Sequence, residues 1–112
     1  MKMKTLIVIC LLATLAVGRA AATNLRGQVV RNVNGYYYPL AGVRVELMVY
    51  DGRAWQLGSY AFTGPDGFYF FINFNPGITF AIRINGYYFP PQPLVIQNIL
   101  PPFYQDIPVI SA

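Results

Sequence analysis

Two stretches of the sequence constrain the fold of this chain more than any other feature. From residue 43 to residue 49 every second position is aliphatic, in the order Val43, Val45, Leu47 and Val49. This is the two-residue period of a β-strand with one buried face. Thr63-Gly64-Pro65-Asp66-Gly67 then supplies the residues of a turn, and an aromatic stretch begins at Phe68. Together the two stretches predict two strands of one β-sandwich.

The rest of the chain predicts further short strands and no helix beyond the N-terminal segment. Turn residues such as Asn34-Gly35, Asp51-Gly52 and Asn75-Pro76-Gly77 separate the apolar stretches. None of these stretches combines the 3.6-residue period with the caps of a helix. We therefore expect an all-β fold, a seven-stranded antiparallel β-sandwich, with strands over residues 24–31, 42–50, 55–62, 68–74, 79–84, 94–100 and 103–110.

Three finer expectations concern the arrangement of these strands. The strands over residues 42–50 and 55–62 are expected to pair with each other. Residues 68–74 are almost continuously apolar, which is typical of a strand that is covered on both faces. Prolines bracket the last two strands, and because proline cannot donate a ladder hydrogen bond, we expect frayed or edge positions there.

Residues 1–22 have the pattern of a secretory signal peptide. Lys2 and Lys4 precede an apolar run from Leu6 to Val17, and the small residues Ala20-Ala21-Ala22 follow. The run is about a dozen residues long, whereas a helix that spans a membrane needs roughly 20. We expect a signal helix that is cleaved after Ala22. This leaves a single domain over residues 23–112 without an integral membrane span, in the extracellular medium, at the cell surface or in the periplasm.

The net charge falls when this segment is removed. The full chain has eight basic and four acidic residues, a net charge of +4. Lys2, Lys4 and Arg19 lie in the segment, so five arginines against four carboxylates leave a net charge of +1 over residues 23–112. Such a weak, dispersed charge cannot form the basic stripe that displaces counterions from a phosphate backbone. We therefore expect no nucleic-acid partner.

Residues for catalysis or metal binding are missing or scattered. The chain has no histidine, which is the usual base at neutral pH and the commonest metal ligand. Its one cysteine, Cys10, lies in the signal segment, so we expect neither a disulfide nor thiol chemistry in the domain. We expect neither an enzyme nor a bound cofactor or metal, because no spacing pairs the carboxylates for acid–base work, namely Glu46, Asp51, Asp66 and Asp106.

Four spaced signals resemble the carboxypeptidase regulatory-like family, over roughly residues 25–109. They are the segments 39–47, 63–70, Asn75-Pro76-Gly77 and Gly86-Tyr87. The family has a transthyretin-like (prealbumin-like) sandwich, an Ig-like Greek key, and consists of non-catalytic modules of secreted and surface proteins. The resemblance implies the same fold and a binding or accessory role here. The related hydroxyisourate hydrolases end in Tyr-Arg-Gly-Ser, whereas residues 109–112 read Val-Ile-Ser-Ala, so that activity is not implied.

An aromatic motif that occurs twice predicts a binding surface. Asn34-Gly35 and Asn85-Gly86 are each followed by three aromatic residues and a proline. If consecutive strands run antiparallel, both motifs lie in loops at one end of the sandwich, where binding residues often lie. Tyrosine rings offer a broad face with a hydroxyl group at the edge. We therefore expect a protein or carbohydrate partner to bind there, with Arg31 or Arg83 nearby, through Tyr36, Tyr37, Tyr38, Tyr87, Tyr88 and Phe89.

Three other interpretations stay open. The rings could instead plug the end of the sandwich, because a domain of about 90 residues without disulfides needs buried rings for stability. Edge strands without lysine could pair between copies and give a homo-oligomer or a self-assembling structural protein, with residues 68–74 as the aggregation-prone stretch. The chain could also be an accessory subunit of an exported enzyme or of an outer-membrane complex.

Overall fold

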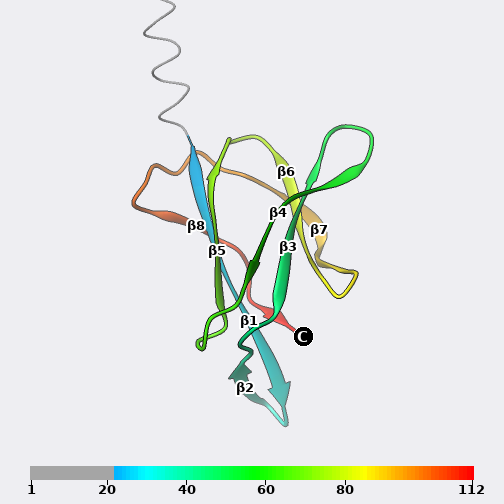
Figure 1. Ribbon diagram of the computed structural model, residues 1–112, viewed down its shortest axis with the longest axis vertical. Helices are drawn as coiled ribbons and strands as arrows, with labels where there is room; N and C mark the ends of the chain where they lie inside the picture. Colours follow the sequence, from blue (N-terminus) through cyan, green and yellow to red (C-terminus); the bar gives the residue numbers. More distant parts are fainter. Residues whose placement is uncertain (1–21) are drawn as a thin grey trace, which may run out of the picture.

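The computed structural model describes residues 22–112, which form nine β-strands and no helix (Figure 1). The all-β class expected from the sequence is confirmed for this range. The expected signal peptide lies, except for Ala22, outside the described residues. The strands are β1 (Thr23–Val33), β2 (Tyr36–Pro39), β3 (Arg44–Tyr50), β4 (Trp55–Phe62), β5 (Phe68–Phe74), β6 (Thr79–Ile84), β7 (Tyr87–Val95), β8 (Tyr104–Asp106) and β9 (Ile110–Ser111).

The strands form two sheets that share one core. In the first sheet, β1 pairs antiparallel with β2 and β5 and parallel with the short strands β8 and β9. The expectation of seven strands that are all antiparallel is therefore wrong, since residues 22–112 form nine strands and residues 103–110 contain two short ones in place of one. The second sheet is antiparallel throughout, in the order β4-β3-β6-β7. This arrangement is compatible with a β-sandwich, because both sheets contribute to one buried cluster that includes Leu25, Val29, Tyr69, Phe71, Val45, Leu47, Phe80 and Ile82.

Alternation along the strands decides which side chains enter this core. Val45 and Leu47 of β3 are fully buried, whereas Arg44 and Glu46 lie on the outer face of the sheet. Fully burying one such aliphatic side chain stabilises the fold by about 1.5–3 kcal/mol. The inward row of β3 agrees with the sequence expectation, as does the pairing of β3 with β4. Residues 79–84 of the sequence alternate in the same way, which predicts Phe80, Ile82 and Ile84 as the inward row of β6, and all three are buried.

The two aromatic motifs are strands rather than loops, which corrects the sequence interpretation. Asn34 and Gly35 have φ angles of 52° and 85°, and Asn85 and Gly86 have φ angles of 50° and 81°. Positive φ at both central residues is the geometry of the two-residue type I′ turn, which folds a strand back on its predecessor. Accordingly β2 pairs with the end of β1, and β7 pairs with β6.

Two further expectations are wrong. Most of residues 94–100 are irregular, because β7 ends at Val95 and Ile96 bonds through its backbone to Gly77 and Ile78. In addition, β5 is not covered on both faces. Phe70 and Ile72 are 48% and 62% exposed, since none of the described strands lies over the outer face of the first sheet. The strand at one edge of the second sheet is β7, whose residues 87–93 were expected to form a loop.

Candidate binding surfaces

The six aromatic residues predicted to bind a partner lie on two different sheets. Tyr36, Tyr37 and Tyr38 belong to β2 in the first sheet, whereas residues 87–89 begin β7 in the second. In Figure 1 the β1–β2 hairpin is at the bottom and the β6–β7 turn is at the right, apart in this view. The structure thus keeps the residues of each motif together but does not join the two motifs into one surface.

Five of the six rings are exposed to solvent. Each of the five tyrosines is at least 42% exposed, the value for Tyr88. Phe89 is half-buried and packs against the core, so the plugging alternative describes this ring and not the tyrosines. Each motif also has an arginine across the strand pair, because Arg31 is opposite Tyr38 and Arg83 is opposite Tyr88. Whether these rings bind a partner stays a prediction.

Tyr88 belongs to a larger aromatic group on the outer face of the second sheet. Its ring centroid lies 5.9 Å from that of Trp55, which in turn lies 5.4 Å from that of Tyr50. A groove of about 260 Å³ is lined by Trp55 and Tyr88 together with Ala81, Pro90, Pro91 and Pro93. Because the two rings are in contact, the groove lies beside the ring pair, next to the small side chain of Ala81 and the three prolines.

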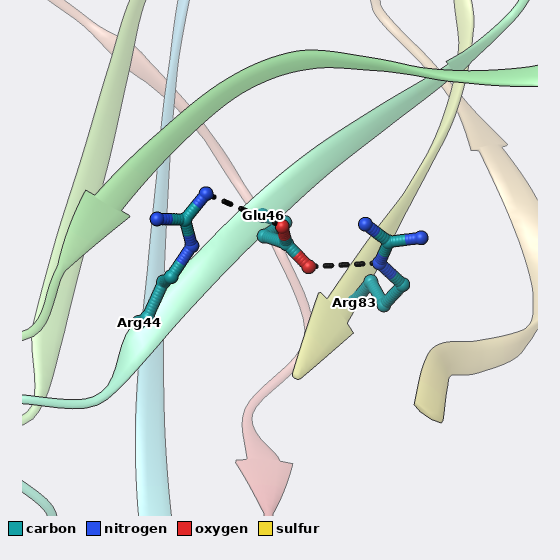
Figure 2. Close-up of polar contacts among 3 residues, drawn as sticks. All are labelled: Arg44, Glu46 and Arg83. Atoms are coloured by element: carbon teal, nitrogen blue, oxygen red, sulfur yellow. Dashed lines mark hydrogen bonds and ion pairs between the residues drawn. The ribbon is translucent and has the colours of Figure 1, made fainter. Parts of the chain in front are cut away.

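Figure 2 shows a row of three ion-paired side chains, Arg44, Glu46 and Arg83. The row lies beside this groove, because the Cζ atom of Arg83 is 6.0 Å from the ring centroid of Tyr88. Arg83 Nε donates to Glu46 Oε1 at 2.8 Å, and Arg44 Nη2 lies 3.5 Å from Glu46 Oε2. The hydrogen bond from Arg83 lowers the pKa of the Glu46 carboxyl below its ordinary value, and the same bond raises the pKa of the Arg83 guanidinium. All three groups are therefore charged at neutral pH, with one positive charge in excess.

Arg44 connects this row to a second pair of rings. Its Cζ lies 4.2 Å from the ring centroid of Tyr60, which is within cation–π distance. Tyr60 contacts Phe62 edge-on, with the ring centroids 6.1 Å apart. Aromatic rings thus lie on both sides of a charged row. We call this surface the aromatic face, and it consists of Tyr50, Trp55, Tyr60, Phe62 and Tyr88 with Arg44, Glu46 and Arg83.

The first sheet has a shallow hollow of its own beside β2. It measures about 490 Å³, and no charged side chain lines it. The lining residues are Gln28, Val30, Tyr37, Val109 and Ser111. This hollow therefore offers a mostly apolar contact area, whereas the aromatic face also offers fixed charges.

Metal ligands do not gather anywhere in residues 22–112, since no three histidine, cysteine, aspartate or glutamate side chains lie close enough to hold an ion. Within the same range, no helix has the length and apolarity that crossing a membrane would require. Both findings concern only this part of the chain.

Comparison with known proteins does not identify a relative. No protein-family model, no curated protein and no solved structure matches the chain. The resemblance to the carboxypeptidase regulatory-like family therefore rests on the four sequence signals alone.

Sequence reasoning missed most of the aromatic face. The signal that was available is alternation, because Arg44, Glu46 and Arg83 occupy the outward positions of strands whose inward positions were predicted correctly. The sequence does not show that β3 lies beside β6, which brings Glu46 to Arg83 across 37 residues. Trp55 and Tyr60 were placed on a strand, but without a neighbour that would have suggested a binding role.

Proposed function

We propose that this chain is a non-catalytic β-sandwich module that binds a carbohydrate chain through the aromatic face. The observation that carries this proposal is the groove lined by the contacting rings of Trp55 and Tyr88, beside the 2.8 Å ion pair of Arg83 with Glu46. A sugar ring has an apolar face of C–H groups and a rim of hydroxyl groups. A site for sugars therefore needs aromatic rings with a few fixed polar groups at their edges.

The polar groups of the aromatic face are held in place before a ligand binds. The Glu46 carboxylate lies between two guanidinium groups, and its side chain is only 16% exposed. Holding these rotamers in advance reduces the side-chain entropy lost on binding. Each guanidinium has five N–H donors, so one shared carboxylate leaves most of the donors of Arg44 and Arg83 for the hydroxyl or carboxyl groups of a sugar.

The proposal includes the fold type and the cellular location. A transthyretin-like topology is supported by the four sequence signals and by two sheets around one core. Export is supported by the pattern of residues 1–22 and by the start of β1 at Thr23, directly after the expected cleavage site. N-terminal sequencing of the exported protein should find Thr23 first, and a protein that retains Met1 would contradict the cleavage.

A glycan array followed by calorimetric titration of the best ligand tests the carbohydrate proposal. The substitution Tyr88→Ala should weaken binding of this glycan by at least about tenfold. It should leave the melting temperature nearly unchanged, because the Tyr88 ring is exposed. Tyr36→Ala on β2 is the matched control and should bind like the wild type. A ligand that depends on Tyr36 and not on Tyr88 would place the site on the first sheet, and the absence of any glycan ligand would reject the proposal.

A protein partner is the second candidate, and a different observation favours it. Every residue of β2 is exposed, and Tyr37 also lines the hollow on the first sheet. Tyrosine is enriched at the centres of protein interfaces. Affinity capture from exporting cells should retain a protein with the wild type and lose it with the double variant Tyr36→Ala/Tyr38→Ala. An exported enzyme or an outer-membrane complex among the captured proteins would support the accessory-subunit role, and an unchanged set of proteins would contradict this candidate.

A further inference from the structure

The free edge of β5 points to a second copy of this chain, independently of the carbohydrate proposal. β5 pairs with β1 and is the last strand in the order β2-β1-β5. Its sequence, FYFFINF, has neither a proline nor a charged residue. Edge strands of natural proteins usually carry such residues, because a row of unpaired backbone groups is a template for another strand. A β-bulge lies near the end of β5, between Phe71 and Phe74, where Asn73 has a φ angle of 65°. The edge before this bulge therefore has neither proline nor charge to guard it.

The backbone register shows which groups of β5 lie on this edge. Val29 of β1 donates its N–H to the carbonyl of Gly67 at 2.9 Å, just before β5 begins. The N–H and C=O groups of successive residues point alternately to the two sides of a strand. The odd-numbered residues of β5 thus direct their backbone groups to β1, and the even-numbered residues from 68 to 72 direct theirs to the free edge.

Two of these three residues have backbone groups to offer. The N–H of Phe68 donates to the Asp66 carboxylate at 3.1 Å, and its carbonyl accepts from the N–H of Gly64 at 2.9 Å. Phe68 is therefore satisfied within its own turn. Phe70 and Ile72 are left with one donor and one acceptor each on the open side of the strand.

The side chains of the same two residues form an exposed apolar patch. Phe70 and Ile72 lie on the outer face of the first sheet, where the ring of Phe70 contacts that of Tyr104 with centroids 5.6 Å apart. Arg26, which is opposite Phe70, is neutralised by Asp106 in a 2.8 Å ion pair. The Asp66 carboxylate lies at the Phe68 end of the edge, so in an antiparallel pair the two Asp66 carboxylates are at opposite ends. A second copy can therefore approach this edge without repulsion between like charges.

We propose that two copies of the chain pair antiparallel through β5, about a two-fold axis at Phe71. In this register Phe70 of one copy is opposite Ile72 of the other, and each such pair exchanges both of its N–H···O hydrogen bonds. The Phe70 and Ile72 side chains then pack on each other across the strands. The register is self-complementary, because every backbone group left open on this edge meets a partner. In a register shifted by two residues, Ile72 would instead lie opposite Phe68, whose backbone groups are already hydrogen-bonded.

The edges of β7 and β4 are less suited to this contact. β7 contains Pro90, Pro91 and Pro93, which have no N–H to donate. β4 has the exposed residues Tyr60 and Phe62, but the Arg44 guanidinium lies over the Tyr60 ring at 4.2 Å. Pairing two copies through β4 would bring two such charges together, which costs stability. This makes β4 the natural control edge.

Sedimentation equilibrium of the full chain, expressed with its own N-terminal segment, tests the proposal. The wild type should sediment as a dimer. Ile72→Pro removes one edge donor that β1 does not use, and Phe70→Lys places like charges across the axis, so each should raise the dimer dissociation constant by at least about tenfold. The matched substitutions Phe62→Pro and Phe62→Lys on β4 should leave the dimer intact.

Amide hydrogen exchange gives a readout at the two residues themselves. The amides of Phe70 and Ile72 should exchange slowly at high protein concentration and fast on dilution, because only the second copy protects them. A wild type that is monomeric at every concentration would overturn the proposal. A dimer that survives both β5 variants, or one that Phe62→Lys dissociates equally well, would also overturn it.

Discussion

Tyr69 has a hydroxyl group that is buried without a hydrogen-bond partner among residues 22–112. Its ring belongs to the core and is 1% exposed, and the hydroxyl lies over Gly27 of the neighbouring strand. A β-carbon at position 27 would overlap this hydroxyl, so glycine is required there for space. Burial also raises the pKa of the Tyr69 hydroxyl well above its ordinary value, which keeps the group neutral.

Tyr69→Phe should therefore stabilise the domain. Removing a buried hydroxyl that has no partner recovers its desolvation cost, which is about 1–3 kcal/mol. Urea unfolding of the variant should show a higher midpoint with an unchanged slope. Tyr38→Phe on the exposed strand β2 is the control and should change little. A loss of stability in Tyr69→Phe would mean that the hydroxyl has a partner, such as a bound water.

Glu46 should make stability depend on pH in the acid range. Its carboxyl pKa is lowered in the folded state, chiefly by the hydrogen bond from Arg83. A lowered carboxyl pKa contributes stability above the ordinary pKa of the group, and this contribution is lost as the pH falls through the folded value. The free energy of unfolding, measured against pH by urea titration, should fall less on acidification in Glu46→Gln than in the wild type.

Asp51 gives this experiment its control. The backbone N–H groups of Ala54 and Arg53 lower the pKa of the Asp51 carboxyl in the β3–β4 turn. Asp51 therefore makes the free energy of unfolding depend on pH with the same sign as Glu46. Glu46→Gln should accordingly reduce, and not abolish, the fall of the free energy of unfolding on acidification. Identical slopes in Glu46→Gln and the wild type would show that the ion-paired row is not stabilising.

At the scale of elements, the two Asn-Gly hairpins have the same turn and different support. Every residue of β2 is exposed. In contrast, β7 carries Phe89 and Leu94, which pack against the core. A turn that is needed to hold core residues contributes to global stability, whereas an exposed hairpin can open locally at little cost.

Gly86→Val should accordingly destabilise the domain more than Gly35→Val. Both glycines have positive φ, 81° and 85°, and a β-branched residue there costs on the order of 1–3 kcal/mol. In the β1–β2 hairpin the backbone strain should be relieved by local opening of the hairpin. The global free energy of unfolding should therefore change by less than about 0.5 kcal/mol. Equal effects in thermal and urea unfolding would contradict this difference between the hairpins.

The same two hairpins show which structural features could be predicted from the sequence and which could not. Alternation identified the inward residues of β3 and β6, because a strand with one buried face has an apolar residue at every second position. The Asn-Gly pairs were recognised as turns, but the tyrosines after them were assigned to loops. The available signal was the two-residue Asn-Gly turn itself, which requires a returning strand. β2 could not be recognised from alternation, because both of its faces are exposed and no row of buried apolar residues marks it.

At the scale of the whole molecule, β1 is the central strand of the first sheet. It pairs with four others, β2, β5, β8 and β9. The parallel pairs with β8 and β9 join residues about 80 positions apart in sequence, and no local pattern encodes such a contact. The pairing of β3 with β6 likewise joins residues that are far apart, with 37 positions between Glu46 and Arg83, so the aromatic face could not be assembled from the sequence.

Hydrogen exchange across the domain should reflect this central position. The amides of Leu25 and Val29, whose side chains are fully buried, should exchange only through global unfolding and be the slowest. The amides of Tyr36 and Tyr38 should exchange through local opening and be the fastest of those paired in strands. NMR-detected exchange measures both sets in one sample. Similar rates in β1 and β2 would contradict a stable centre with an independent hairpin.

The parallel contacts of β1 also have a consequence for the time at which the chain can fold. Its first strand leaves the ribosome early, but Ile110 and Ser111, which pair beside Val29 and Val30, are synthesised about 80 residues later. Contacts between such distant positions slow folding, because a long loop must close before they form. Under the export proposal this delay would be useful, because a chain whose first sheet is incomplete can still pass through a channel as an extended polypeptide until residues 110 and 111 have been made.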